Sequence, residues 1–501
     1  MRFPRSSGVL LHPTSLPGPY GIGDAGREAH RFVDWLVSAG QSLWQVLPLG
    51  PTGYGDSPYQ CFSAFAGNPL LTSPDALLAD GVLAKEDLAS APRLPAEHVD
   101  FGAVITWKRE LLERAAVRFA RGEGGSRGLH AEFEAWRRGH AAWIEDVALF
   151  LALKDANGGA PWVEWSEPLR RRDPAALAAA RERLAHEVFS HAFRQWAFFR
   201  QWDELRAYAA KRGVSIVGDA PIFVAHDSAD VWAHPRLFQL GDDGRPTAVA
   251  GVPPDYFSET GQLWGNPLYR WDAMAAEGWA WWIERMRATF ALVDRVRLDH
   301  FIGFTRCWAV PAGAADAREG AFEPGPGAAL FRALEGALGR LPILAEDLGV
   351  LTPEVEALRD EFSFPGMKVL QFAFGAEPDN TFLPHHHVPN SVVYTGTHDN
   401  DTTMGWWEAA TEAERHHART YLANPLHEPA WDFLRACAAS VADTCVVPAQ
   451  DLLQLGTAAR MNFPGRPSGN WSWRLPSGAL DGVIASRLQG LVTLFGRGRK
   501  A

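Results

Sequence analysis

The stretch Val293–His300, VDRVRLDH, has the strand character of a short buried run and leads into an acidic residue, Asp299. An ionised carboxylate is costly inside a sheet, so Asp299 is expected where a strand leaves the core. This pairing of a short strand with a polar residue at its carboxyl end recurs along the whole chain. It is the pattern that decides the fold.

Seven further runs of the same kind are present, and segments with helical character separate them. Eight such strands indicate a buried parallel sheet, and eight is the number in a (β/α)8 barrel of the TIM type. An open doubly wound sheet is the alternative, but no GxGxxG sequence follows the first run. The other seven runs are Gly8–His12, Leu43–Leu49, Val214–Asp219, Ile343–Asp347, Met367–Phe372, Val392–Asp399 and Cys445–Asp451.

The runs are unevenly spaced, and the longest interval follows the second run. Its residues show helical periodicity, with many Glu/Arg pairs, which predicts a helical subdomain inserted in a barrel loop. The predicted helical stretches are Lys108–Phe119, Glu132–Asp155 and Ala175–Arg212.

The interval after the third run is rich in Gly, Pro and aromatic residues, which predicts a long ordered loop over the active site. The sequence ends soon after the eighth run, so no C-terminal β-sandwich is expected. The expected parts are therefore residues 1–70 with the first two strands, a mainly helical subdomain in 71–212, and the rest of the barrel in 213–501 with the loop insertion 225–282.

Three acidic residues, Asp299, Glu346 and Asp399, stand at predicted strand ends. In a barrel these ends meet at one mouth, which is where the active site lies. Converging carboxylates suit glycoside chemistry, in which an ionised group attacks the anomeric carbon and a protonated group donates to the leaving oxygen. Each acid taken alone fits a helix cap or an Arg partner equally well. The set of three favours catalysis.

Basic and polar neighbours strengthen this interpretation. Arg297 lies two residues before Asp299 and so faces the same side of the strand, where its guanidinium would hold the carboxylate ionised. His300 and His398 flank two of the acids and would hydrogen-bond sugar hydroxyls, although a structural donor role is as common for such residues.

Composition narrows the class of partner. The 501-residue chain has a formal net charge of -11, which argues against nucleic acid binding. Its four cysteines lie at no zinc-ligand or disulfide spacing, so no metal site is expected and a reducing, cytoplasmic location fits best. The N-terminus does not have the pattern of a signal peptide, and no run approaches the length of a membrane span. The composition therefore favours a neutral ligand, which the protein would bind by aromatic stacking and hydrogen bonds.

Eight strings, in order, resemble the amylomaltases, the 4-α-glucanotransferases of glycoside hydrolase family 77 in the α-amylase clan. The strings are HPTSLPGPYGIGD (12–24), WQVLPLGPTGYGDSPYQCFSAFAGNP (44–69), GDAPIFVAHDSADVW (218–232), GQLWGNPLY (261–269), RLDHFIGF (297–304), AEDLG (345–349), TGTHDNDT (395–402) and NFPGRPSGNWSWR (462–474).

The resemblance implies a role for each matching residue. It makes Asp299 the nucleophile with Arg297 as its partner, Glu346 the general acid/base, and Asp399 the transition-state stabiliser. The residues that it implies in glucan binding are Ser57, Tyr59, Asp219, Gln262, Trp264, Arg297, His300, His398 and Asn470.

The implied activity is disproportionation of α-1,4-glucans with glucose or a glucan as acceptor, without metal or organic cofactor. An amylase-type hydrolase is the near alternative. A non-catalytic glucan-binding barrel and a metal-dependent isomerase are the alternatives from other classes. Two departures from the family pattern, Ile302 in place of Arg and Cys61 in place of Ser, leave the three acids untouched. The oligomeric state is not indicated.

Overall fold

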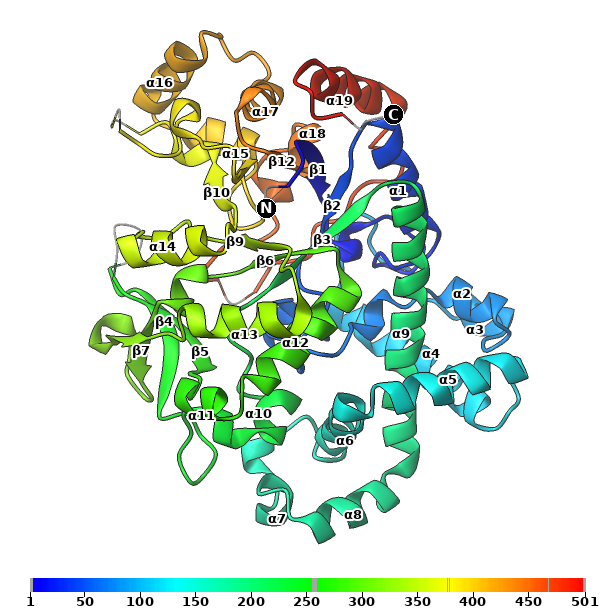
Figure 1. Ribbon diagram of the computed structural model, residues 1–501. Helices are drawn as coiled ribbons and strands as arrows, with labels where there is room; N and C mark the ends of the chain where they lie inside the picture. The colour runs from blue at the N-terminus through cyan, green and yellow to red at the C-terminus, as the bar shows by residue number, and fades with distance from the viewer. Residues whose placement is uncertain (1–2, 255–258, 376, 378, 467, 499–501) are drawn as a thin grey trace.

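The centre of the molecule is a sheet of eight parallel strands (Figure 1). The computed structural model describes residues 3–254, 259–375, 377, 379–466 and 468–498. In the sheet the strands follow the order β10-β11-β12-β1-β2-β3-β6-β9. They are β1 (Ser6–Leu10), β2 (Leu43–Gln45), β3 (Ser215–Ala220), β6 (Arg295–Leu298), β9 (Ile343–Ala345), β10 (Gly366–Val369), β11 (Ser391–Tyr394) and β12 (Thr444–Pro448).

The two ends of this sheet meet between β9 and β10. The amide of Ala345 donates to the carbonyl of Pro365 at 2.9 Å. The carboxylate of Asp347 accepts from the amide of Met367 at 2.7 Å. The sheet is thereby nearly closed into a barrel, as the eight runs predicted, and the open doubly wound alternative is wrong.

Burial explains why these short runs become strands. Every residue of β1, β2, β11 and β12 is buried, as expected for a parallel sheet covered by helices. Phe32 of the first outer helix, for example, packs edge-on against Trp44 of β2 with ring centroids 5.1 Å apart. Outside the interval between β2 and β3, the helices that connect the strands are α1 (Arg27–Ser38), α10 (Ala229–Ala233), α11 (Trp271–Ala276), α12 (Ala280–Leu292), α13 (Ala328–Leu338), α14 (Pro353–Glu361), α15 (Thr403–Ala409), α16 (Glu412–Leu422) and α17 (Pro429–Ala439). Two more, α18 (Ala449–Leu452) and α19 (Gly482–Leu494), follow the last strand.

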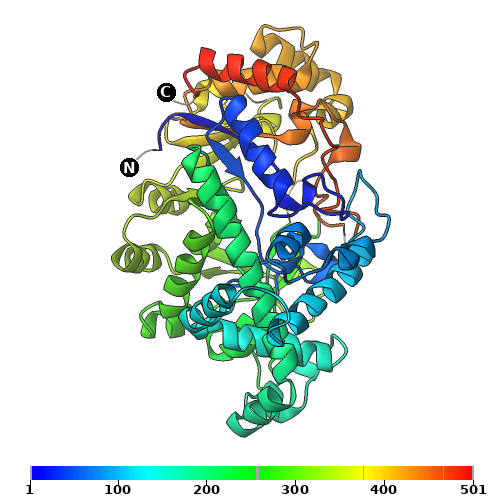
Figure 2. The ribbon, with the colours of Figure 1, turned by 90° about the vertical axis from the view of Figure 1, so that its right-hand side faces the viewer.

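Helices also fill the interval between β2 and β3. The longest, α9, runs along one side of the barrel to the helices at the far end of the molecule (Figure 2). Two of the predicted helical stretches are each divided between two helices: Glu132–Asp155 between α5 and α6, which are separated by His140, and Ala175–Arg212 between α8 and α9, which are separated by Leu184. The helices are α2 (Pro74–Ala79), α3 (Lys85–Ala89), α4 (Phe101–Ala120), α5 (Arg127–Gly139), α6 (Ala141–Ala156), α7 (Glu167–Arg170), α8 (Pro174–Arg183) and α9 (Ala185–Lys211).

The interval 225–282 is more regular than the predicted loop. Besides α10 and α11 it holds two strands, which join two strands from the β6–β9 connection in an antiparallel sheet of order β5-β4-β7-β8. The sequence analysis did not predict this sheet. Residues 255–258, inside the predicted loop, lie outside the described residues. The strands are β4 (Ala248–Val252), β5 (Gln262–Pro267), β7 (Arg306–Pro311) and β8 (Ala321–Pro324).

Beyond β12, the described residues form helices and loops, which return to the barrel. The side chain of Arg497 is buried and donates to the carbonyls of Ser6 in β1, Ala438 in α17 and Ala442 just after α17. None of the helices in the described part of the chain has the length and apolar composition that crossing a bilayer would take. The residue boundaries given above for the three parts stay a prediction.

Candidate active site

Arg297 lies at the centre of a buried cluster of charges. Parallel pairing places Asp219 of β3 beside Arg297 of β6. Nη1 of Arg297 lies 2.9 and 2.8 Å from the two carboxylate oxygens of Asp219 and 2.8 Å from Oδ1 of Asp299. The Asp219 side chain has no exposed surface, whereas that of Asp299 is 26% exposed. One guanidinium therefore holds two carboxylates, of which Asp299 is the accessible one.

Glu346 lies beside Asp299. Leu298 of β6 pairs with Ala345 of β9, so the next residue of each strand emerges at the same edge of the barrel. The carboxylate of Glu346 accepts from the amide of His300 at 2.8 Å and from the amide of Leu348 at 2.9 Å. His300 adopts a left-handed backbone conformation, φ 50°, which few residues other than glycine adopt.

The pKa of Glu346 differs from that of an ordinary carboxyl. Burial raises this pKa to about 7, and the negative charge of Asp299 adds to the rise, while Arg297 opposes it. Burial likewise raises the pKa of Asp219, again against the pull of Arg297. Glu346 thus carries a proton for much of the time at neutral pH.

Asp399, in the segment after β11, has one hydrogen-bond partner for each carboxylate oxygen. Nε2 of His398 lies 3.2 Å from Oδ2, and Nδ2 of Asn462 donates to Oδ1 at 2.6 Å. Burial alone would raise the pKa of Asp399, but the charge and hydrogen bond of His398, with the bond from Asn462, hold it well below its usual range. In return, Asp399 raises the pKa of His398 against the effect of burial. Asp399 is therefore ionised.

Tyr59 connects the two groups of charges. Its hydroxyl lies 2.8 Å from Nε2 of His398 and donates to Oδ2 of Asp219 at 3.1 Å. Its ring stacks on the His398 ring with centroids 5.3 Å apart. Hydrogen bonds and ion pairs thus form a continuous chain from Asp399 to Asp299, which lies along one side of the site.

The remaining predicted residues divide into two groups. Trp264 packs edge-on against the His300 ring, with centroids 4.8 Å apart, and its indole donates to Gln262 at 3.1 Å, which brings both residues near the acids. Ser57 accepts from the amide of Tyr59, and so shapes the turn that carries this ring. Asn470 instead accepts from the amide of Phe463 at 2.9 Å, so it braces its own loop and contacts none of the three acids.

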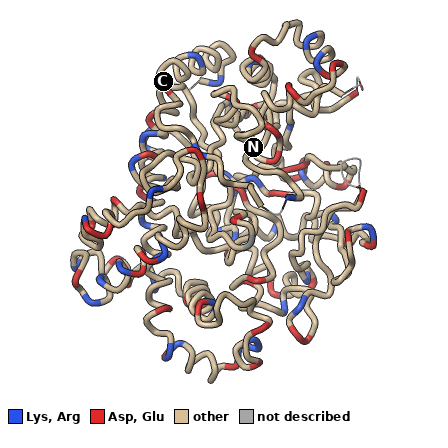
Figure 3. Tube along the Cα trace, turned by 180° about the vertical axis from the view of Figure 1, so that it is seen from behind, with Lys and Arg blue, Asp and Glu red and all other residues tan. Residues whose placement is uncertain are grey.

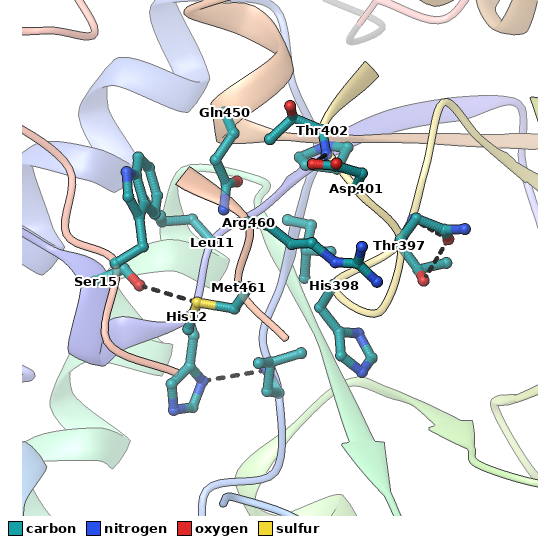
Figure 4. A pocket seen from close by; sticks show the side chains of 15 residues that line it. Leu11, His12, Ser15, Thr397, His398, Asp401, Thr402, Gln450, Arg460 and Met461 are labelled. Atoms are coloured by element: carbon teal, nitrogen blue, oxygen red, sulfur yellow. Dashed lines mark hydrogen bonds between the residues drawn. The ribbon is translucent and has the colours of Figure 1, made fainter. Parts of the chain in front are cut away.

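Two residues at the site were missed by the sequence analysis. Asn462 contacts Asp399 as described, and Nη2 of Arg460 donates to the backbone carbonyl of Asp399 at 2.6 Å. Figure 4 shows Arg460 lining the same pocket as His398, although the two residues come from different barrel segments. The family-like string that begins at Asn462 was the only sign of this contact in the sequence.

The arrangement suits acid–base chemistry on a neutral ligand. Two carboxylates, Asp299 and Asp399, belong to one network of contacts, and burial raises the pKa of the neighbouring carboxyl of Glu346 to about 7. Acidic and basic residues are interspersed along the chain in Figure 3, rather than gathered in a basic stripe of the kind that binds nucleic acid.

Comparison with known proteins assigns the family. Residues 11–480 match the model of glycoside hydrolase family 77, described as 4-alpha-glucanotransferase. The chain is 53% identical to the 4-alpha-glucanotransferase of Thermus thermophilus over 98% of this chain and 99% of the relative, and 48% identical to that of Synechocystis sp. over 98% of each.

A solved structure agrees with this result. The amylomaltase of Streptococcus agalactiae in complex with acarbose matches with a TM-score of 0.95 and 39% sequence identity, covering 99% of this chain and 100% of that one. The chain therefore belongs to glycoside hydrolase family 77, the 4-alpha-glucanotransferase family.

Proposed function

We propose that this enzyme transfers a segment of an α-1,4-glucan to the 4-hydroxyl of glucose or of another glucan, by a retaining double displacement at Asp299, Glu346 and Asp399. Asp299 attacks the anomeric carbon while Glu346 gives its proton to the departing 4-oxygen. The acceptor hydroxyl then loses its proton to Glu346 and attacks the covalent glycosyl-enzyme from the same face.

The observation that carries this proposal is the contrast between two neighbouring carboxyl groups. Arg297 pairs with Asp299 at 2.8 Å and leaves part of its carboxylate exposed to the site. Burial raises the pKa of Glu346 to about 7, so that this group has a proton to give. One site therefore supplies a nucleophile and an acid at the same pH.

Asp399 supplies the third charge. Its carboxylate is ionised and 42% exposed, so it is placed to stabilise the oxocarbenium-like charge of the transition state and to bind ring hydroxyls. His300, His398 and Tyr59 form the polar side of the sugar site, and Asp219, whose side chain has no exposed surface, supports the Tyr59 hydroxyl from within the protein.

Transfer is favoured over hydrolysis by the family and by the position of Trp264. Its indole lies against His300 at the mouth of the site, where it offers an apolar face to the acceptor and keeps water out. Ser57, Gln262 and Asn470 are proposed to contact sugars of the bound glucan as well. An amylase-type hydrolase is the less supported alternative.

The setting proposed for this activity is the cytoplasm, in maltodextrin or glycogen metabolism. All four cysteines, Cys61, Cys307, Cys437 and Cys445, are free thiols, as fits a reducing compartment. No cofactor takes part in the proposed reaction.

The test is incubation of the purified protein with maltotriose, with products separated by chromatography. Disproportionation gives glucose together with maltodextrins longer than maltotriose and leaves the number of reducing ends unchanged. Products shorter than maltotriose alone, with new reducing ends, would assign the chain to the hydrolases instead.

A further inference from the structure

The segment that follows β12 comes back to the site and contacts Asp399 in two places. Nδ2 of Asn462 donates to the carboxylate at 2.6 Å, and Nη2 of Arg460 donates to the backbone carbonyl of Asp399 at 2.6 Å. The carboxylate has one other partner within the described residues, His398, on its second oxygen. Without Asn462, Oδ1 would face the site with no protein donor.

The backbone fixes the position of Asn462. The backbone amide of Asn462 donates at 3.1 Å to the carbonyl of His398, which is the residue before Asp399. Nε of Arg460 donates to the carbonyl of Asn462 at 2.7 Å. The amide of Trp471 closes the loop on the carbonyl of Met461 at 2.7 Å. These backbone hydrogen bonds, on both sides of Asn462 in the chain, hold its side-chain amide in place against the Asp399 carboxylate.

We propose that Asn462 is a positioning residue for Asp399, and that Arg460 acts with it by clamping the backbone of the same residue. Asn462 orients the Asp399 carboxylate toward the sugar ring and Arg460 fixes its main chain, so that the segment after β12 completes the catalytic centre. This inference rests on the proposed function of Asp399 as the stabilising carboxylate.

Because Asn462 donates a hydrogen bond to a carboxylate, the variant Asn462→Asp tests the proposed role. In Asn462→Asp the new carboxyl is close in shape to the amide, but it donates to Asp399 only when protonated. At pH 8 the two carboxylates repel each other, and at pH 5 a proton held between them restores the hydrogen bond. The ratio of kcat for this variant to kcat for the wild type is therefore expected to rise at least about fivefold from pH 8 to pH 5.

Asn462→Leu removes the donor at every pH. A hydrogen bond to a charged group corresponds to a factor of about ten or more in rate, so kcat in the maltotriose assay is expected to fall about tenfold at pH 5 and pH 8 alike. The matched control is Asn390→Asp, which makes the same change in charge at a half-buried residue just before β11, where Nδ2 donates to the carbonyl of Ser363. The ratio of kcat for Asn390→Asp to kcat for the wild type should be the same at pH 5 and pH 8.

A ratio for Asn462→Asp that does not change with pH, or wild-type kcat in Asn462→Leu, would overturn the positioning role. The recovery of Asn462→Asp at pH 5 separates this role from a loss of folding, because a misfolded variant would not recover at acidic pH. If the wild type itself does not lengthen maltotriose, the proposed function fails. If the wild type lengthens maltotriose and the ratio is flat, only the role of Asn462 fails.

Discussion

Nη1 of Arg297 lies 2.8 Å from Oδ1 of Asp299, and the same nitrogen holds the buried carboxylate of Asp219. Because both residues lie on or directly after β6, two positions apart, this ion pair is set by the pleat of a single strand. It leaves Asp299, the more exposed of the two carboxylates that Arg297 contacts, with a positive charge beside it at the mouth of the barrel.

Replacing the nucleophile tests this relationship directly. Asp299→Asn is expected to lower kcat at least about 1000-fold, because an amide cannot form the glycosyl-enzyme. The measurement is the rate of glucose release from maltotriose, with the circular dichroism spectrum as the check on folding. A correctly folded variant that keeps a tenth of the wild-type rate would remove Asp299 from the role of nucleophile.

The raised pKa of Glu346 predicts how activity depends on pH. Glu346 must be protonated to act as the acid, so kcat should fall as pH rises through about 7. Glu346→Gln cannot give a proton, and its kcat should lie at least about 100-fold below wild type. A wild-type rate that stays level from pH 6 to pH 9 would contradict this assignment.

The same residue predicts a change in stability. The pKa of Glu346 is raised in the folded state, from 4.5 to about 7, so its stabilising contribution is complete below the lower value and is lost as pH rises through the higher one. Glu346→Gln removes the cost of burying the charge. Its melting temperature should exceed that of the wild type by roughly 1–3 °C at pH 8 and by little at pH 5. Calorimetry at both pH values measures this, and an equal difference at both would show that the charge is not the cause.

Tyr59 offers a separate test of the chain of hydrogen bonds. Tyr59→Phe keeps the ring stacked on His398 but removes the hydroxyl that joins it to Asp219. The kcat should fall about tenfold, as expected for hydrogen bonds to charged groups. Tyr421→Phe removes a hydroxyl that bonds to His385 on an exposed segment, and it should leave the rate unchanged. Equal rates for the two variants would show that the link does not matter.

Trp264 is expected to control access of water. Trp264→Ala should raise the share of maltotriose that is hydrolysed several-fold, because the indole no longer covers His300. Counting new reducing ends against glucose released gives this share. Leu263→Ala is the control, since successive strand residues face opposite sides and Leu263 is already 47% exposed. A share that is the same in wild type and Trp264→Ala would assign exclusion of water to another part of the site.

Local pattern explains what the sequence predicted. All eight barrel strands lie within or overlap the predicted runs, because a strand buried on both faces needs a continuous apolar stretch. The contact of Arg297 with Asp299 also follows from the period of a strand. By contrast, the break at His140 lies between two stretches of good helical pattern, so periodicity alone could not reveal it.

Long-range pairing explains what was missed. β4 and β7 form their sheet across a large separation in sequence, and Gly251 in β4 lies opposite Trp308, so neither strand shows a clear alternating pattern. The hydrogen bond from Asn462 to Asp399 joins the segments after two barrel strands and leaves no periodic trace. Such contacts depend on how the segments after the strands pack against one another, which composition and spacing do not determine.

The pairing of β1 with β12 determines the point in synthesis at which the barrel can form. Ser6 leaves the ribosome more than 400 residues before its neighbour in the sheet, Thr444. The barrel cannot close before β12 has been made, so the unfinished sheet has an open edge while those residues are translated. A nascent chain that stops before β12 would carry Asp299 and Glu346 but no closed barrel to hold them, and would be a target for chaperones rather than a partial catalyst.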